Sequence, residues 1–197
     1  MQRMFDPKCT PEEYQKQGKS YLFPDLTGEL CPQCMADKLR KHGYYLRWLC
    51  VIDFRGDILI RRHICKTCGK TVSLLPCFAH PRIGYGIQFI IGILNLFYLD
   101  GSSVSHATNA FNKNNGPLCS RQLLRHFRRR LEGNINRLIM EIIALLKLQS
   151  PPVTAQREEK RKRARQFLEY IHSFDPKDVS LKLFEHSGTT ILTPLTQ

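Results

Sequence analysis

Four of the eight cysteines of this chain stand in two close pairs. Cys31 and Cys34 flank a Pro-Gln dipeptide, and Cys65 and Cys68 flank a Lys-Thr dipeptide that is followed by Gly69. Two thiolates on one tight turn supply two ligands to a tetrahedral Zn²⁺, so two such turns complete its coordination shell. Because four cysteines leave no open position, the spacing predicts one structural zinc ion and not a catalytic one.

Other readings of these cysteines remain open. A redox dithiol of the thioredoxin type has one pair in a βαβ context, whereas this chain has two pairs that bracket a predicted hairpin. His42, His63 and Cys50 are alternative ligands, but each is explained more simply as a surface or hairpin residue.

The chain has 197 residues and a formal net charge of +13, with 30 Lys and Arg against 17 Asp and Glu. Such a charge favours polyanionic partners, with nucleic acid first and an anionic membrane surface second. The segment 1–7 has no apolar signal-peptide core, so we expect reduced thiols and a cytoplasmic, nucleoid-associated protein of bacterial type. The apolar run 83–99 contains Gln88 and Asn95, which favours a buried core helix over a membrane span.

The predicted fold class is α+β, with an N-terminal zinc ribbon followed by a mostly helical helix-turn-helix region. Residues 44–52 and 58–64 are rich in β-branched and aromatic side chains and predict a hairpin between the cysteine pairs. The predicted parts are an N-terminal extension (1–30), a zinc ribbon (31–77), a helical domain (78–148), and a linker, charged helix and tail (149–197).

Helices are predicted over 83–99, 103–112, 120–148 and 157–172, and a short one begins after Thr10. Gly133 lies inside the third of these and predicts an interruption there. Leu124, Phe127 and Leu131 give this third helix an inward stripe at helical spacing.

Five arginines between residues 120 and 130 make that helix basic. A short helix followed by a basic amphipathic one predicts a helix-turn-helix, whose second helix enters the major groove of double-stranded DNA. The alternative is a solvated basic face, and the connection 112–119 is longer than the turn of the simplest motif. The predicted base-reading residues are Ser120, Arg121, Gln122 and Arg125. The predicted phosphate-binding residues are Arg128, Arg129 and Arg130.

Two further patterns lie beyond this segment. An apolar series at four-three spacing predicts either packing against the 83–99 helix, which we favour, or the seam of a homodimer. A second basic cluster has two explanations: it contacts the phosphate backbone of DNA, or it is the solvated face of a charged helix with local ion pairs. The apolar series is Leu131, Ile135, Leu138, Ile142 and Leu145. The basic cluster is Arg157, Lys160, Arg161, Lys162, Arg163 and Arg165.

The segments around the cysteines resemble the zinc ribbon of bacterial insertion-sequence proteins, which place it before a helix-turn-helix. The resemblance covers residues 31–130 and is carried by Cys-Pro-Gln-Cys and by 62–76, Arg-His-Ile-Cys-Lys-Thr-Cys-Gly-Lys-Thr-Val-Ser-Leu-Leu-Pro. It implies that Cys31, Cys34, Cys65 and Cys68 bind zinc and that the helix from Ser120 reads DNA.

About fifty residues follow Leu148, too few for a catalytic domain with three metal-binding carboxylates. We therefore expect a regulator or targeting subunit, acting with a transposase or another protein, and no enzyme. Two competing hypotheses are an RNA binder and a protein-interaction module that uses Tyr44, Tyr45 and Trp48 as anchors. A transposase or nuclease that acts alone is disfavoured because no nucleophile or carboxylate cluster is evident.

Overall fold

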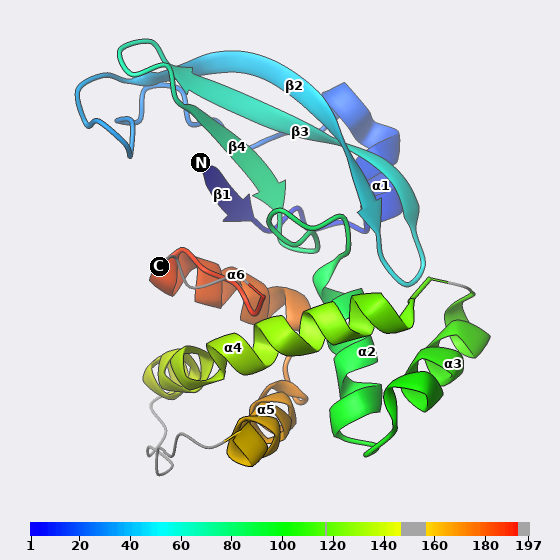
Figure 1. The fold of residues 1–197 in the computed structure, drawn as a ribbon. Coiled ribbons are helices and arrows are strands. Elements are labelled where there is room, and N and C mark those ends of the chain that lie inside the picture. The colour runs from blue at the N-terminus through cyan, green and yellow to red at the C-terminus, as the bar shows by residue number, and fades with distance from the viewer. Residues whose placement is uncertain (117, 147–156, 193–197) are drawn as a thin grey trace. The chain divides into compact units, whose positions relative to one another are not determined.

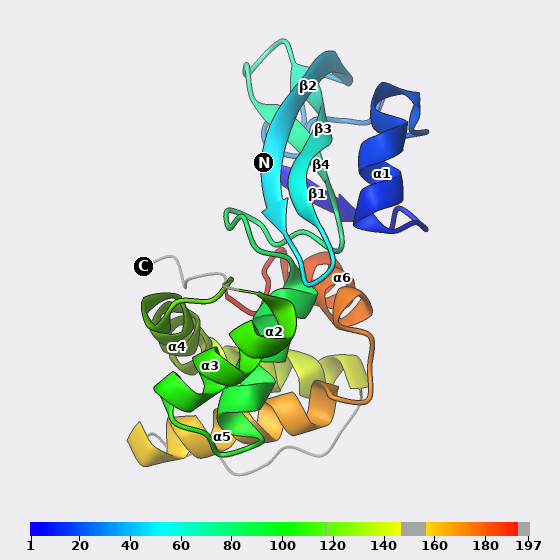
Figure 2. The same cartoon turned by 90° about the vertical axis from the view of Figure 1, so that its right-hand side faces the viewer.

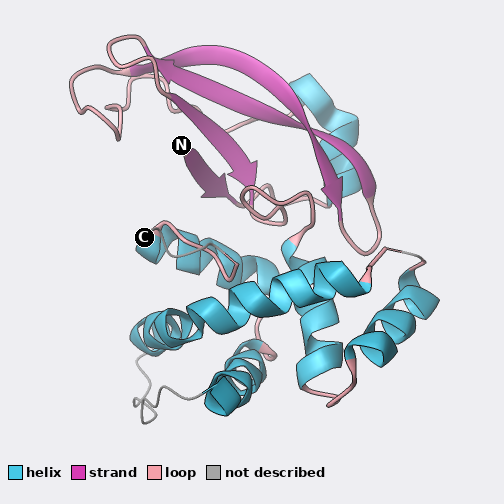
Figure 3. Ribbon diagram, in the orientation of Figure 1, coloured by secondary structure: helices cyan, strands magenta, loops and turns pink. Residues whose placement is uncertain are grey.

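The computed structural model of this chain describes residues 1–116, 118–146 and 157–192. These residues form two compact units, Met1–Gly86 (unit 1) and Ile87–Gln197 (unit 2). Within the described residues the four strands lie in unit 1, whereas helices make up unit 2 (Figure 3). The predicted α+β class is therefore confirmed, with segregated strands and helices.

Unit 1 is built on a four-stranded mixed sheet in the order β1-β4-β3-β2 (Figure 1). The predicted hairpin is present and is longer than expected, with Leu39 of β2 opposite Cys65 of β3. β4 pairs antiparallel with β3, and β1 pairs parallel with β4. The strands are β1 (Gln2–Phe5), β2 (Leu39–Cys50), β3 (Arg55–Cys65) and β4 (Thr71–Pro76).

The predicted N-terminal extension contributes to this sheet. Its residues form β1, then α1 (Pro11–Gln17) and a short 3₁₀ turn, Gly18–Ser20. The sequence did not predict β1, because its pairing partner β4 lies about seventy residues further along the chain. The Thr10 cap is confirmed: its hydroxyl accepts the Glu13 backbone N–H, and the Glu13 carboxylate accepts the Thr10 N–H at 2.8 Å.

α1 lies alongside the sheet (Figure 2) and completes an edge that β4 leaves open. β4 pairs only with residues 62–64 of β3. Beyond that stretch, the Leu59 carbonyl accepts a hydrogen bond from Tyr14 Oη at 2.9 Å, and the Asp57 carbonyl accepts one from Gln15 Nε2 at 3.0 Å. Helical side chains therefore satisfy backbone acceptors that a neighbouring strand would otherwise satisfy.

Unit 2 consists of helices around one apolar core. The predicted stripe Leu124, Phe127 and Leu131 is fully buried. The predicted interruption at Gly133 was wrong, because α4 continues through it with buried residues on both sides. The helices are α2 (Ile87–Tyr98), α3 (Val104–Asn115), α4 (Arg121–Leu146), α5 (Arg157–Ile171) and α6 (Pro176–Ser187).

α6 was not predicted, although its local signals are present. Asp175 caps it by accepting the Lys177 backbone N–H at 2.8 Å, and Pro176 occupies the first turn. Gly188 ends it in the left-handed conformation. Among the described residues, no helix is long and apolar enough to cross a membrane.

Candidate metal centre and basic helix

The sulfur atoms of Cys31, Cys34, Cys65 and Cys68 converge in unit 1, and all four lie within 4.8 Å of one another. Cys31 Sγ is 3.7 Å from Cys68 Sγ, and Cys34 Sγ is 3.6 Å from Cys65 Sγ. Zn–S bonds of about 2.3 Å in a tetrahedron place sulfurs about 3.8 Å apart. In the part of the chain that is described, these cysteines are the one cluster of its kind that could hold a metal ion.

The two cysteine turns share one backbone geometry. The Met35 N–H donates to the Cys31 carbonyl at 2.9 Å, and the Gly69 N–H donates to the Cys65 carbonyl at 2.9 Å. Both donors adopt positive φ, 54° at Met35 and 69° at Gly69. Glycine adopts this conformation without penalty, whereas for methionine it costs roughly 1–2 kcal/mol of conformational free energy. The first turn therefore holds a strained residue beside the sulfur cluster.

Two strand ends position these turns. The first turn precedes β2, and the second connects β3 to β4, so the Leu39–Cys65 pairing brings them together. Cys31 and Cys65 are fully buried and pack with an apolar cluster, whereas Cys34 and Cys68 are partly exposed. That cluster is Leu26, Leu39, Val72 and Leu74.

The thiols of this cluster differ in acidity. The Cys34 and Gln33 backbone N–H groups donate to Cys31 and lower the pKa of its thiol to about 7. The Lys70 backbone N–H lowers the pKa of Cys68, but burial and the hydrogen bonds to the other three cysteines outweigh it and raise this pKa to about 11. Adjacent thiolates repel one another, and a cation bound among them would offset this repulsion.

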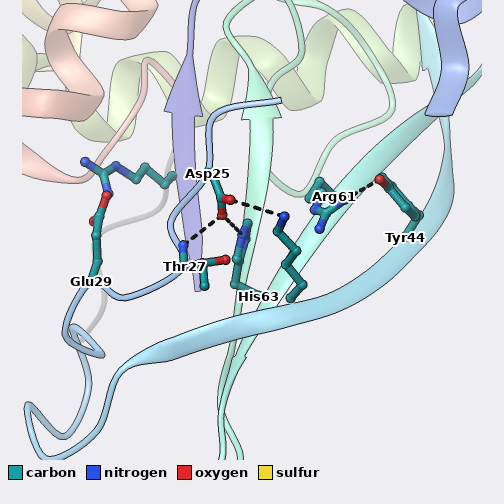
Figure 4. A network of polar contacts seen from close by, with 8 residues as sticks. Asp25, Thr27, Glu29, Tyr44, Arg61 and His63 are labelled. Carbon is teal, nitrogen blue, oxygen red and sulfur yellow. Dashed lines mark hydrogen bonds and ion pairs between the residues drawn. The ribbon is translucent and has the colours of Figure 1, made fainter. Parts of the chain in front are cut away.

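The alternative ligands lie outside the sulfur cluster. Buried His63 points its Nε2 toward Asp25 Oδ1 at 3.4 Å, and the same carboxylate binds Lys41 Nζ at 3.2 Å and the Thr27 N–H at 2.9 Å (Figure 4). These contacts hold the pKa of Asp25 well below its usual range, led by the hydrogen bonds from Thr27. His63 thus ties the loop before β2 to β3 in a structural role.

The predicted DNA-binding residues fall into two groups along the first half of α4. Arg121, Gln122, Arg125 and Arg129 are exposed on the side opposite the buried stripe. Ser120 is also exposed, and its hydroxyl caps α4 by accepting the Leu123 N–H at 3.1 Å. The exposed group thus contains three arginines, Arg121, Arg125 and Arg129.

Arg128 and Arg130 are partly buried and have partners within unit 2. The Arg128 guanidinium lies 4.1 Å from the ring centre of Phe97, and its Nη2 is 3.4 Å from Glu132 Oε1. Arg130 Nη1 donates to the Leu192 carbonyl at 3.2 Å. Sequence reasoning missed Phe97 and Glu132, although Glu132 stands four residues after Arg128, the spacing of a helical ion pair.

The connection before α4 is tied back to α3. Asn112 Oδ1 accepts the N–H groups of Leu118 (3.0 Å) and Cys119 (2.8 Å), and Asn112 Nδ2 donates to the Cys119 carbonyl at 2.9 Å. α3 itself packs on α2, with the Phe111 and Phe89 rings 4.9 Å apart. One side chain therefore sets how the chain turns from α3 into α4.

The second basic cluster is divided by burial. Arg163 is 4% exposed and bonds Asn136 Oδ1, whereas Arg161 and Lys162 are exposed. Arg165 is exposed and paired with Glu169 at 2.9 Å. The Arg157 side chain lies outside the described residues, and Lys160 is partly exposed.

The apolar series of α4 packs inside unit 2. Four members, Leu131, Ile135, Leu138 and Ile142, are buried, and Leu145 is partly buried. α4 contacts α2, α5 and α6, so these side chains form the core of unit 2 and are not exposed as a dimer seam.

The predicted interaction anchors of the hairpin also differ from one another. Trp48 is 52% exposed and its neighbour on the same face, Leu46, is 65% exposed. Tyr44 and Tyr45 are partly buried under Arg61 and Arg62, whose guanidinium carbons lie 4.8 and 5.5 Å from the two ring centres. Of the three predicted anchors, only Trp48 is therefore exposed, and Leu46, which was not predicted, is exposed beside it.

No protein-family model, curated protein or solved structure matches this chain.

Proposed function

We propose that this chain is a zinc-stabilised protein that binds double-stranded DNA, and that it acts as a regulator or targeting subunit of a mobile element. Zinc would be held by the four cysteines of unit 1, and DNA by the exposed face of α4. A cytoplasmic, nucleoid-associated location belongs to the same proposal.

The sulfur cluster is the observation that carries the metal half of the proposal. Sulfur separations of 3.6 and 3.7 Å fit the edges of a tetrahedron around Zn²⁺. A set of four thiolates selects soft or borderline ions such as zinc over magnesium or calcium. Met35 offers independent support, because backbone strain at a turn is typical of a ligand-holding segment.

The DNA half of the proposal is supported by the exposed arginines of α4, Arg121, Arg125 and Arg129. Its N-terminal residues Arg121, Gln122 and Arg125 project from the stable core below them, as in the recognition helix of a helix-turn-helix. Arginine pairs bidentately with guanine and glutamine with adenine, so these side chains suit base readout. Arg129 is placed one turn further along and suits a phosphate contact.

The test is selection from a random duplex library with zinc-loaded protein, followed by titration of the selected duplex at several salt concentrations. Specific binding predicts an enriched motif and an affinity that falls linearly with salt on logarithmic axes. Arg121→Gln and Arg125→Gln should each reduce the binding free energy for the selected duplex by about 1–3 kcal/mol more than that for random DNA. Arg40→Gln, an exposed arginine of β2, is the matched control. Binding with no motif and equal losses in all variants would exclude base readout by α4.

A second candidate function is supported by Leu46 and Trp48. Two large apolar side chains exposed on one face of β2 are a typical anchor for a protein partner such as a transposase. Alanine at both positions should then abolish assembly with that partner and leave duplex affinity unchanged. Assembly that survives the double substitution would exclude this surface.

A further inference from the structure

A pocket of about 430 Å³ opens beside α4, and its lining includes Gln122 and Arg125, two of the residues proposed for base readout. The residues that line it are all polar or charged, with three arginines against a single carboxylate. Clefts lined by charge of one sign concentrate ions of the opposite sign. The lining residues are Gln122, Arg125, Arg128, Arg129 and Glu132.

One guanidinium of this pocket is held in place. Arg128 packs over the Phe97 ring and reaches Glu132 Oε1 at 3.4 Å. Glu132 Oε1 also accepts a hydrogen bond from Tyr98 Oη at 2.5 Å. The Arg128 and Glu132 side chains are both 25% exposed, so they are fixed by packing yet still reach the pocket. A pre-positioned guanidinium loses little conformational entropy when it binds an anion.

Further positive charge surrounds this fixed pair. The Arg161 guanidinium of α5 lies 5.1 Å from the centre of the same Phe97 ring. Arg125 and Arg129 are exposed and one helical turn apart on α4. Several arginines therefore lie near one carboxylate, and a bound anion would reduce the repulsion between their guanidinium groups.

We propose that this pocket is a binding site for phosphate groups, with Arg128 as the fixed donor and Glu132 as a built-in opposing charge that limits the affinity. Guanidinium forks match the spacing of phosphate oxygens. The phosphates come from a nucleic-acid backbone, which rests on the proposed function, or from a free polyphosphate. Glu132 lowers phosphate affinity by repulsion while its contacts keep Arg128 in place.

The decisive comparison is Glu132→Gln with Glu169→Gln. Both substitutions raise the net charge equally, and both residues pair with an arginine four residues earlier on a unit 2 helix. Only Glu132 lines the pocket. Glutamine still accepts the Tyr98 hydrogen bond, so E132Q should tighten binding by about three- to tenfold, and E169Q by less than about twofold. Arg129→Gln should weaken binding by about fivefold, and Arg165→Gln, outside the lining, by less than about twofold.

The probes are a labelled 20-base-pair duplex, followed by fluorescence anisotropy, and pyrophosphate, followed by calorimetry. Each variant is first checked by circular dichroism and melting. Selective tightening by E132Q with both probes supports the site. The same selectivity with pyrophosphate alone, when the wild-type chain binds no duplex, supports the phosphate site and overturns DNA binding. Equal responses of E132Q and E169Q, together with equal responses of R129Q and R165Q, overturn the site, while duplex binding by itself would keep the DNA proposal standing.

Discussion

Removing the metal that we propose at the four cysteines is expected to unfold unit 1 and to leave the helices of unit 2 folded. Cys31 and Cys65 are fully buried beside Leu39 and Leu74, so loss of the metal disorders ligands that are part of an apolar cluster. Nothing comparable is expected in unit 2, because its core is built from helix packing.

The size of the effect follows from one metal site per chain. For an ion that binds only the folded state, stability rises by about 1.4 kcal/mol for each tenfold increase in free ion above the dissociation constant. Unit 1 has 86 residues, a size at which 1 kcal/mol shifts Tm by about 4–8 °C. The expected shift is therefore about 6 to 11 °C for each tenfold change in buffered free zinc.

The chain carries its own pair of probes for this measurement. Trp48 is the single tryptophan and lies in unit 1, so its fluorescence follows unit 1 alone. The helical circular dichroism signal comes chiefly from α2 to α6 of unit 2. Melting the protein in zinc buffers while both signals are recorded separates the two units. Cys34→Ser should abolish the zinc dependence of the Trp48 transition, and Cys9→Ser, outside the cluster, should preserve it.

The reasoning would be refuted if the Trp48 transition moved by less than about 2 °C over a hundredfold range of free zinc above the dissociation constant. It would also be refuted if Cys9→Ser removed the response as completely as Cys34→Ser. Elemental analysis of the purified protein should find one zinc per chain, and a different ion at full occupancy would replace zinc in the proposal.

Three further outcomes are expected. Gly133→Ala should stabilise unit 2 by about 0.5–1 kcal/mol in urea unfolding, because a Cβ there meets nothing within 4 Å inside a helix; destabilisation would contradict this packing. Thr10→Ala should cost about 1 kcal/mol through loss of the capping box, whereas Thr10→Ser should retain most of it. Burial, with Arg130 and Arg129 nearby, lowers the pKa of His126 from 6.5, so the folded state binds this proton less readily than the unfolded state. Unit 2 should therefore lose stability as the pH falls through about 6.5 and below, and His126→Gln should reduce that loss in melts compared at pH 5 and pH 7.5.

Local patterns predicted much of the fold because the interactions behind them are short in sequence. The strands of the hairpin, the Thr10 cap and the buried face of α4 each have signals within a short stretch of sequence, and each is present. α6 also has local signals, Asp175 and Pro176, which the weak apolar pattern of the tail obscured. By contrast, β1 depends on pairing with β4, which no local pattern predicts.

The candidate metal ligands were determined by the sequence itself, because two ligands on one turn are set by local spacing and cysteine chemistry. The sequence also predicted that the two turns meet, whereas only the tertiary structure gave the register, with Leu39 opposite Cys65, and the sulfur separations of 3.6 and 3.7 Å. The tertiary structure also separated the exposed arginines, Arg125 and Arg129, from Arg128, which Phe97 and Glu132 hold. The sequence contains each charge, but the exposure and partner of a long side chain depend on elements packed against it from elsewhere in the chain.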